Sequence, residues 1–286
     1  MTTVGIVSPG AMGSALGRVL AAGGARVVAT TDGRSARTAR LADGLERLPS
    51  LADVVSASEI ILSVVPPGVV REVAIAIAKA ASATRTSPLV ADLNATAPST
   101  MREVASLLAG AGLGTVDGSI SGPPPRAPGT TVVYLSGPRA ERVASLPAPG
   151  LELRLVGETV GRASAVKMST ASFYKGQTAV FAQALRAAHA NGVLELVLED
   201  LGSRHGGLVA DAPRLLQSIA AKAGRYVAEM DEISLSQEDV GLPPELFAAL
   251  ATVYAEISRT GAAKAPEQID LRAPLEDVLE SLERPE

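Results

Sequence analysis

The feature that most constrains this chain is a short apolar run that turns through glycine into a helix near its N-terminal end. Val4 to Val7 is typical of a buried strand, Ser8 to Gly10 interrupts it, and residues 11–22 have the composition of a helix. Such a turn directs free backbone N–H groups and the positive end of the helix dipole at one point, which suits a pyrophosphate. The pattern Gly-x-Gly-x-x-Gly is present with serine in place of its first glycine. The sequence therefore predicts a dinucleotide-binding loop formed by Ser8, Pro9, Gly10, Ala11, Met12 and Gly13; a plain strand-to-helix turn is the alternative.

Strand and helix patterns then alternate over the first part of the chain. Apolar runs at 26–30, 60–65 and 89–93 indicate strands, with helices expected over 69–80 and from Pro98 onward. This alternation predicts an α/β domain with right-handed crossovers and a doubly wound parallel sheet. Ligands of such a sheet lie beyond the carboxyl ends of its strands. We therefore expect further cofactor-binding residues in the loops there, namely Thr30, Thr31, Val65, Pro66, Asn94 and Thr96.

The loop after the second strand lies where a dinucleotide fold recognises the adenosine ribose. A carboxylate there favours NAD, whereas arginine and hydroxyl groups favour the 2′-phosphate of NADP. Asp32 is present, but Arg34 and Ser35 follow it, so the sequence favours NADP and leaves NAD open. The alternative is that Asp32 and Gly33 form a turn and that Ser35 caps the next helix.

The pattern of predicted elements changes at Gly161. Residues 163–190 read as one long helix, and the remainder reads as helical segments without a strand. We predict a dinucleotide-binding domain over residues 1–160 and a helical C-terminal domain over 161–286, led by the long interdomain helix. Glu229, Asp231 and Glu232 are expected on a solvated helix face.

The composition of the chain argues against metal sites, a nucleic-acid surface and a membrane span. The chain has no cysteine, and its two histidines match no metal-binding spacing, so no metal is expected. Residues 1–157 carry 14 basic and 11 acidic side chains, which suits a phosphate-bearing cofactor and falls short of a nucleic-acid surface. No apolar run is long enough for a membrane span and no signal-like segment precedes the first strand, so we expect a cytoplasmic protein. A mainly helical domain on a long helix would expose apolar faces, which favours a homodimer.

Four blocks, in order, resemble the β-hydroxyacid dehydrogenase superfamily, which includes 3-hydroxyisobutyrate and 6-phosphogluconate dehydrogenases. They are the cofactor loop 5–13, the nicotinamide loop 92–98, the substrate block 117–122 and the lysine block 161–167. The C-terminal part is similar to the branch with a phosphogluconate-dehydrogenase-like C-terminal domain of unknown function. The resemblance implies a Rossmann-type domain followed by an all-α domain, and an NAD(P)-dependent dehydrogenase. The chain departs from the superfamily at Thr170 and Ala171, where an asparagine is usual, and at Pro123, where a second glycine is usual.

The lysine block implies a role for Lys167. Hydride transfer at a hydroxyl-bearing carbon needs a group that moves a proton at the oxygen. A lysine among apolar helix neighbours is suited to that work, whereas a lysine that extends along the surface is the alternative. The resemblance implies that Lys167 is the catalytic acid or base, and that Ser121 and Gly122 bind the substrate carboxylate. Further substrate-binding residues are expected on the same helix: Thr170, Tyr174 and Lys175, the last being either an anion ligand or a solvated charge.

The predicted activity is hydride transfer between a nicotinamide cofactor and a small carboxylate with a β-hydroxyl or carbonyl group. Two alternatives stay open. Imine reductases of the same superfamily reduce a C=N bond, often with another proton donor in place of the lysine. A cofactor-binding regulator without turnover would have the same N-terminal loops.

Overall fold

The computed structural model describes residues 1–263, 269–270 and 272–283. It divides into two compact units, Met1–Ser169 and Thr170–Glu286, and helix α7 (Arg162–Ala190) contributes to both. The division falls later than the predicted boundary at 160/161. The physical reason is that the first turn of α7 is hydrogen-bonded to a strand of the first unit.

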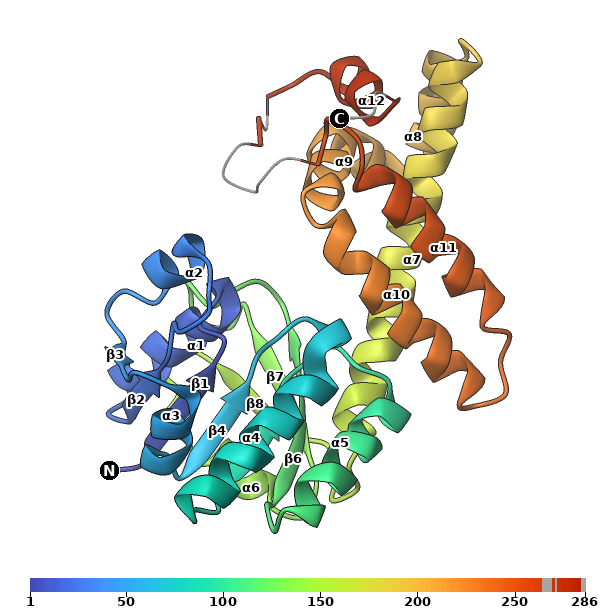
Figure 1. Ribbon diagram of the computed structural model, residues 1–286. Coiled ribbons are helices and arrows are strands. Elements are labelled where there is room, and N and C mark those ends of the chain that lie inside the picture. The colour runs from blue at the N-terminus through green and yellow to red at the C-terminus, as the bar shows by residue number, and fades with distance from the viewer. Residues whose placement is uncertain (264–268, 271, 284–286) are drawn as a thin grey trace. The chain divides into compact units, whose positions relative to one another are not determined.

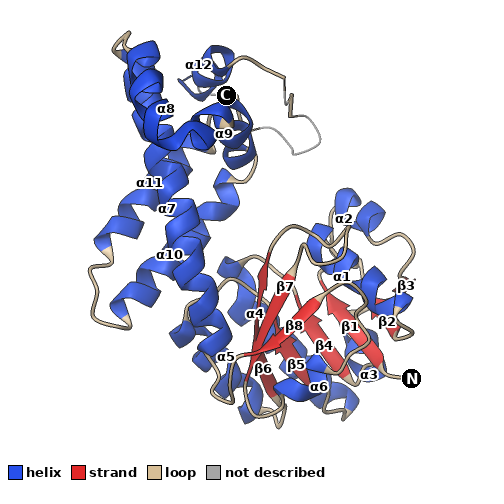
Figure 2. Cartoon of the chain, turned by 180° about the vertical axis from the view of Figure 1, so that it is seen from behind, coloured by secondary structure: helices blue, strands red, loops and turns tan. Residues whose placement is uncertain are grey.

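The first unit contains one eight-stranded sheet with the order β3-β2-β1-β4-β5-β6-β7-β8 (Figures 1 and 2). Strands β1 to β6 are parallel, β7 runs antiparallel to β6, and β8 runs parallel to β7. The order reverses between β1 and β4, which makes this the switch point at which such sheets bind ligands. The strands are β1 Thr3–Val7, β2 Arg26–Ala29, β3 Glu46–Arg47, β4 Ile60–Ser63, β5 Leu89–Asp92, β6 Thr115–Ser121, β7 Val132–Ser136 and β8 Glu152–Leu155.

Helices cover both faces of this sheet (Figure 2). Alternate strand residues separate into two cores: Ile60 and Leu62 belong to one, and Ile61 belongs to the other. This alternation is the two-sided burial expected of parallel strands between helical layers. The doubly wound α/β prediction is thereby confirmed. The helices that pack on the first core are α1 (Ala11–Ala22) and α6 (Ala140–Ala144). Those that pack on the second core are α3 (Leu51–Ala57), α4 (Val70–Thr84) and α5 (Pro98–Gly110). The connections contain α2 (Ala36–Leu41) and the short 3-10 helix η1 (Pro67–Val69).

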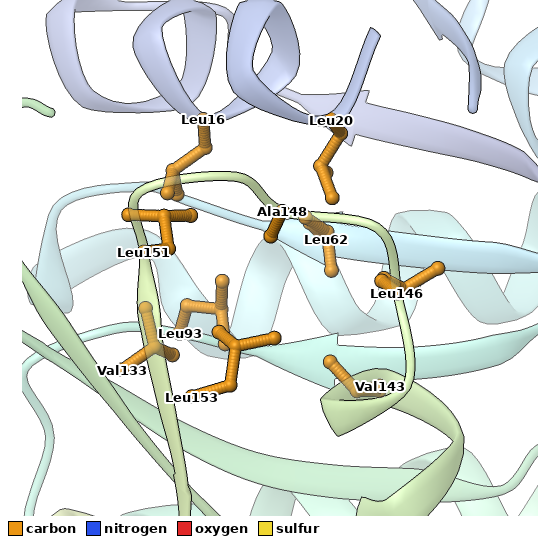
Figure 3. Close-up of a pocket in the computed structure, with 10 residues that line it drawn as sticks. All are labelled: Leu16, Leu20, Leu62, Leu93, Val133, Val143, Leu146, Ala148, Leu151 and Leu153. Atoms are coloured by element: carbon orange, nitrogen blue, oxygen red, sulfur yellow. The ribbon is translucent and has the colours of Figure 1, made fainter. Parts of the chain in front are cut away.

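An apolar pocket lies within the first of these cores (Figure 3). Its volume is about 20 Å³, and its walls include Leu16 and Leu20 of α1, Leu62 of β4 and Leu153 of β8. Every residue that lines it is aliphatic, so no polar group is present to orient a ligand. We interpret the pocket as incomplete packing beneath α1.

Every regular element among the described residues of the second unit is a helix. After α7 come α8 (Leu194–Ala210), α9 (Ala212–Ala220), α10 (Ala223–Glu238), α11 (Glu245–Ile257) and α12 (Leu275–Glu283). Tyr226 of α10 and Tyr254 of α11 meet edge to face with ring centroids 5.2 Å apart. The prediction of an all-α second part is confirmed. Among the described helices, none combines the length and the hydropathy needed to cross a lipid bilayer.

Two acidic residues are buried side by side in the sheet. Asp92 of β5 and Asp117 of β6 are paired in register, and both are almost fully buried. Burial raises the pKa of Asp92 from its usual value of 3.8 to about 7, hydrogen bonds from Asn94 and Ser63 oppose the rise, and the Asp117 charge adds to it. Asp92 ionises near pH 3.8 in the unfolded chain and near pH 7 in the folded chain. Between these pH values the folded state therefore holds one more proton than the unfolded state. The contribution of Asp92 to stability is therefore fully present below about 3.8 and is lost as the pH rises to about 7.

We predict that Asp92→Asn removes this pH dependence. The asparagine cannot ionise, so the variant should gain stability over the wild type as the pH rises from about 4 to 7, by up to about 1.4 kcal/mol per pH unit. Urea unfolding at a series of pH values measures the difference. Asp43→Asn, which alters an exposed ion pair with Arg47, is the control. A difference between Asp92→Asn and wild type that is the same at every pH would contradict the prediction.

Candidate functional site

The loop between β1 and α1 is shaped for the close approach of an anion. Ser8 adopts the left-handed conformation with φ of 66°, and the N–H of Gly10 donates back to its carbonyl at 2.8 Å. The turn is thus formed with serine in the position of the usual glycine. A Cβ on Gly13 would lie 2.7 Å from the Ser8 carbonyl, so only glycine fits there, whereas the space beside Gly10 is open. Helix α1 has no side-chain cap and no acidic residue in its first turn, which leaves its N-terminus suited to a phosphate.

The loops after β4 and β5 are joined by Asn94. Its Oδ1 accepts from the Val65 N–H at 2.6 Å, and its Nδ2 donates to Ser63 Oγ at 3.1 Å. The backbone N–H of Asn94 in turn donates to Asp92 Oδ1 at 3.1 Å. Asn94 is therefore buried scaffolding that fixes the two loops. Pro66, which is exposed, follows Val65 in the first of them.

The loop after β5 also contains the hydroxyl group of Thr96. The side chain is fully buried, and its Oγ1 has no hydrogen-bond partner among the described residues. A buried hydroxyl without a protein partner is rare in folded proteins. Together with the fitted Gly13 turn and the uncapped α1, this hydroxyl shows that the residues present fit a dinucleotide beyond the strand ends.

In the loop after β2, two of the predicted cofactor-binding side chains form hydrogen bonds within the protein. Thr30 Oγ1 accepts from the Asp32 N–H at 3.2 Å and contacts the Pro49 carbonyl, and Ser35 Oγ accepts from the Thr38 N–H at 3.2 Å as the cap of α2. The alternative interpretation of Ser35 as a helix cap is therefore confirmed. Thr31 is partly exposed and Arg34 is exposed, so Arg34 places a cationic side chain at the surface of this loop.

The end of β6 and the start of α7 meet in the first unit. Lys167 Nζ donates to the Ile120 carbonyl at 2.7 Å, directly before Ser121 and Gly122. Lys167 is half-buried, and Ser121 is likewise partly exposed. Gly122 has φ of 114°, and a Cβ there would clash with the Thr130 carbonyl. The structure thus brings the substrate block and the lysine block within hydrogen-bonding distance of each other.

A buried carboxylate fixes this meeting point. Asp117 Oδ2 accepts from the backbone N–H groups of Gly161 at 2.8 Å, Ala163 at 3.0 Å and Ser164 at 3.2 Å. It also accepts from Ser136 Oγ at 2.8 Å, while Asp117 Oδ1 accepts from Ser164 Oγ at 2.7 Å. Sequence reasoning placed Asp117 in the substrate block but missed this cap. The available signal was a charged residue in a strand that is otherwise uncharged, because a buried charge requires buried donors.

The other predicted substrate residues lie in the helical unit. Thr170 and Tyr174 are exposed on α7. Lys175 is mostly buried, forms an ion pair with Glu229 of α10, and lies 4.7 Å from the Tyr226 ring centroid. It is therefore not a solvated charge. The prediction of a solvated helix face for the acidic residues of α10 was wrong for Glu229 and Glu232, which are buried, because α10 turns that side toward α7 and α11.

Comparisons with protein-family models cover most of the chain. Residues 3–148 match the NAD binding domain of 6-phosphogluconate dehydrogenase, and residues 188–257 match a domain of unknown function, DUF1932. No curated protein matches the chain.

Three solved structures illustrate the relationship. A conserved protein of unknown function, reported as structurally similar to 3-hydroxyacid dehydrogenases, is 30% identical with a TM-score of 0.65, covering 89% of this chain and 96% of that one. The 3-hydroxyisobutyrate dehydrogenase of Mycobacterium tuberculosis, solved with L-serine, is 18% identical with a TM-score of 0.69, covering 99% of each chain. An imine reductase from Bacillus cereus is 19% identical with a TM-score of 0.56, covering 92% of this chain and 95% of that one. The last two share the fold.

The resemblance was based on four blocks: the glycine turn, the loop beyond β5, the end of β6 and the lysine beside it. The family model spans the first three of these in one stretch. The chain belongs to the β-hydroxyacid dehydrogenase superfamily, with the NAD-binding domain of 6-phosphogluconate dehydrogenase followed by a helical domain of unknown function.

Proposed function

We propose that this protein is an NADP-dependent oxidoreductase that transfers a hydride between the nicotinamide and a small carboxylate with a β-hydroxyl or carbonyl group. The observation that carries the proposal is the position of Lys167. Its amine is held 2.7 Å from the Ile120 carbonyl, beside Ser121 and Gly122, in the unit that contains the dinucleotide loops. A proton-transfer group thereby lies next to donors suited to a carboxylate.

The cofactor would be held by the loops beyond the strand ends. The main-chain N–H groups at the start of α1 would bind the pyrophosphate, and Arg34 would bind the 2′-phosphate. The Thr96 hydroxyl, which has no hydrogen-bond partner among the described residues, would reach the nicotinamide end. The bound cofactor supplies or accepts the hydride, and the remaining work falls to residues of this chain.

Lys167 would move the proton at the substrate oxygen. In the oxidative direction a neutral amine takes the hydroxyl proton as the carbonyl forms, and in the reductive direction the ammonium returns it. Ser121 Oγ and the Gly122 N–H would bind the carboxylate and hold the reacting carbon in place. If the product is a β-keto acid, the same ammonium can polarise the ketone while the C–C bond breaks and carbon dioxide leaves.

Reduction of a C=N bond is the second candidate, supported by the shared fold of the Bacillus cereus imine reductase. A panel of hydroxy acids, keto acids and cyclic imines, assayed with the preferred cofactor, distinguishes the two. A regulator without turnover would bind the cofactor and leave the whole panel unchanged.

We predict that Lys167→Ala lowers turnover by about 100-fold to 10,000-fold, the usual loss on removing a general acid or base. The thermal shift caused by NADPH should persist, because the pyrophosphate loop is untouched. Lys79→Ala, which removes an exposed lysine from α4, is the matched control. Full turnover by Lys167→Ala would refute the proposed role.

We predict that NADPH stabilises the protein more than NADH and that Arg34 accounts for the difference. Arg34→Ala removes a charge-assisted contact to the 2′-phosphate, so NADPH affinity should fall by about 10-fold to 100-fold while NADH affinity is retained. Calorimetric titration of both cofactors measures this. Arg142→Ala, at an exposed position on α6, should change neither affinity. Equal losses for NADPH and NADH in Arg34→Ala would contradict the assignment.

We further propose that the chain forms a homodimer through its helical unit. Phe173 and Val180 are 64% and 57% exposed and lie seven residues apart, on one side of α7. Such a stripe is suited to a two-fold self-contact. Sedimentation velocity at micromolar concentration should show a dimer that Val180→Asp weakens, whereas Ile75→Asp on α4 leaves it intact. A monomeric wild type would end this proposal.

A further inference from the structure

Asp117 receives more hydrogen bonds than a helix cap requires. Five donors converge on its two oxygens: three backbone N–H groups and two serine hydroxyls. Four of the donors belong to residues 161–164, where α7 begins, and the fifth comes from Ser136 at the end of β7. The carboxylate thus ties the first turn of α7 to two neighbouring strands.

A second contact holds the same turn from its other side. Ser119 Oγ, two residues along β6, donates to the Ala163 carbonyl at 2.7 Å. Ala163 is therefore fixed through its N–H by Asp117 and through its carbonyl by Ser119. Residues four apart lie above one another on a helix, so Lys167 projects from the same face one turn later.

We propose that Asp117 is a positioning residue that sets the location of the Lys167 amine. Three residues of β6 contact this part of α7. Asp117 and Ser119 bind Ala163, and Ile120 binds Lys167. One strand therefore determines both where the helix starts and where the amine lies. The negative charge also stabilises the N-terminus of α7 through the helix dipole. This inference rests on the proposed function of Lys167.

The expected consequence is a loss of catalytic geometry with little loss of cofactor binding. Displacing a catalytic group by about 1 Å can cost about 100-fold in rate. Asp117→Asn retains an acceptor oxygen but loses the charge, whereas Asp117→Ala removes every contact. Turnover should therefore fall in the order wild type, Asp117→Asn, Asp117→Ala, while NADPH affinity stays within the range of the control.

Selective acetylation tests the positioning without a substrate. The chain has five lysines, so mass spectrometry can compare the acetylation rate of Lys167 with that of exposed Lys79 in the same sample. Loss of the bond to the Ile120 carbonyl should raise this ratio in Asp117→Asn by about fivefold, the equivalent of one hydrogen bond. Ser119→Ala should raise it as well, which keeps the test valid if Asp117→Asn fails to fold.

Ser58→Ala is the matched control for stability. Ser58 is also a buried serine whose hydroxyl donates to a helix carbonyl, that of Val54 at 2.6 Å, but it lies before the amino end of β4, whereas Ser119 lies near the carboxyl end of β6. It should lower stability without changing the Lys167 ratio. The proposal would be overturned by an unchanged acetylation ratio of Lys167 to Lys79 in both Asp117→Asn and Ser119→Ala. It would also be overturned if this ratio rose while the variants kept wild-type turnover and Lys167→Ala was inactive.

A double-mutant cycle separates this proposal from the function on which it rests. If Asp117 acts through the lysine, adding Asp117→Asn to Lys167→Ala should cause no further loss of turnover. Additive losses would show that Asp117 acts by another route. Undiminished turnover by Lys167→Ala would instead remove the proposed function, and the acetylation ratio would still report whether Asp117 positions the amine.

Discussion

The arrangement of the first unit depends on a carboxylate buried within the sheet. Asp117 lies in β6 with no exposed surface, where an unsatisfied acid would be costly. Five donors compensate that cost, and three of them are backbone groups that only a helix beginning at this point can supply. The same contacts therefore satisfy the buried acid, cap α7 and bring Lys167 to the end of β6. Stability and the proposed chemistry share one set of hydrogen bonds.

The loops beyond the carboxyl ends of the parallel strands are stabilised differently, because their groups are already arranged before any ligand binds. Ser8 adopts a left-handed conformation that disfavours a residue with a side chain, and Thr96 keeps a buried hydroxyl without a partner among the described residues. Both features cost stability in the protein alone. Asn94, by contrast, is fully engaged in joining the loops after β4 and β5. Satisfied scaffolding thus surrounds one strained turn and one unsatisfied hydroxyl, as expected where a ligand completes the site.

Sequence reasoning was most reliable where one residue type permits one conformation. Gly13 could be recognised because only glycine fits against the Ser8 carbonyl, and the apolar runs could be recognised because parallel strands are buried on both faces. It was least reliable for side chains with two uses. The Ser35 hydroxyl caps α2, and Glu229 binds Lys175 within the helical unit. Composition cannot separate these uses, because a hydroxyl or a carboxylate suits a ligand as well as it suits a neighbouring helix.

The sequence by itself determined the α/β order of the first unit, the glycine turn, the helical second part and the membership of the superfamily, because each follows from local periodicity or from residues close in the chain. Only the tertiary structure decided that Asp117 caps α7, which begins 45 residues later, and that Lys167 reaches the Ile120 carbonyl. Those contacts join residues far apart in sequence. Their partners are set by strand order and register, which emerge only when the sheet and its helices pack together.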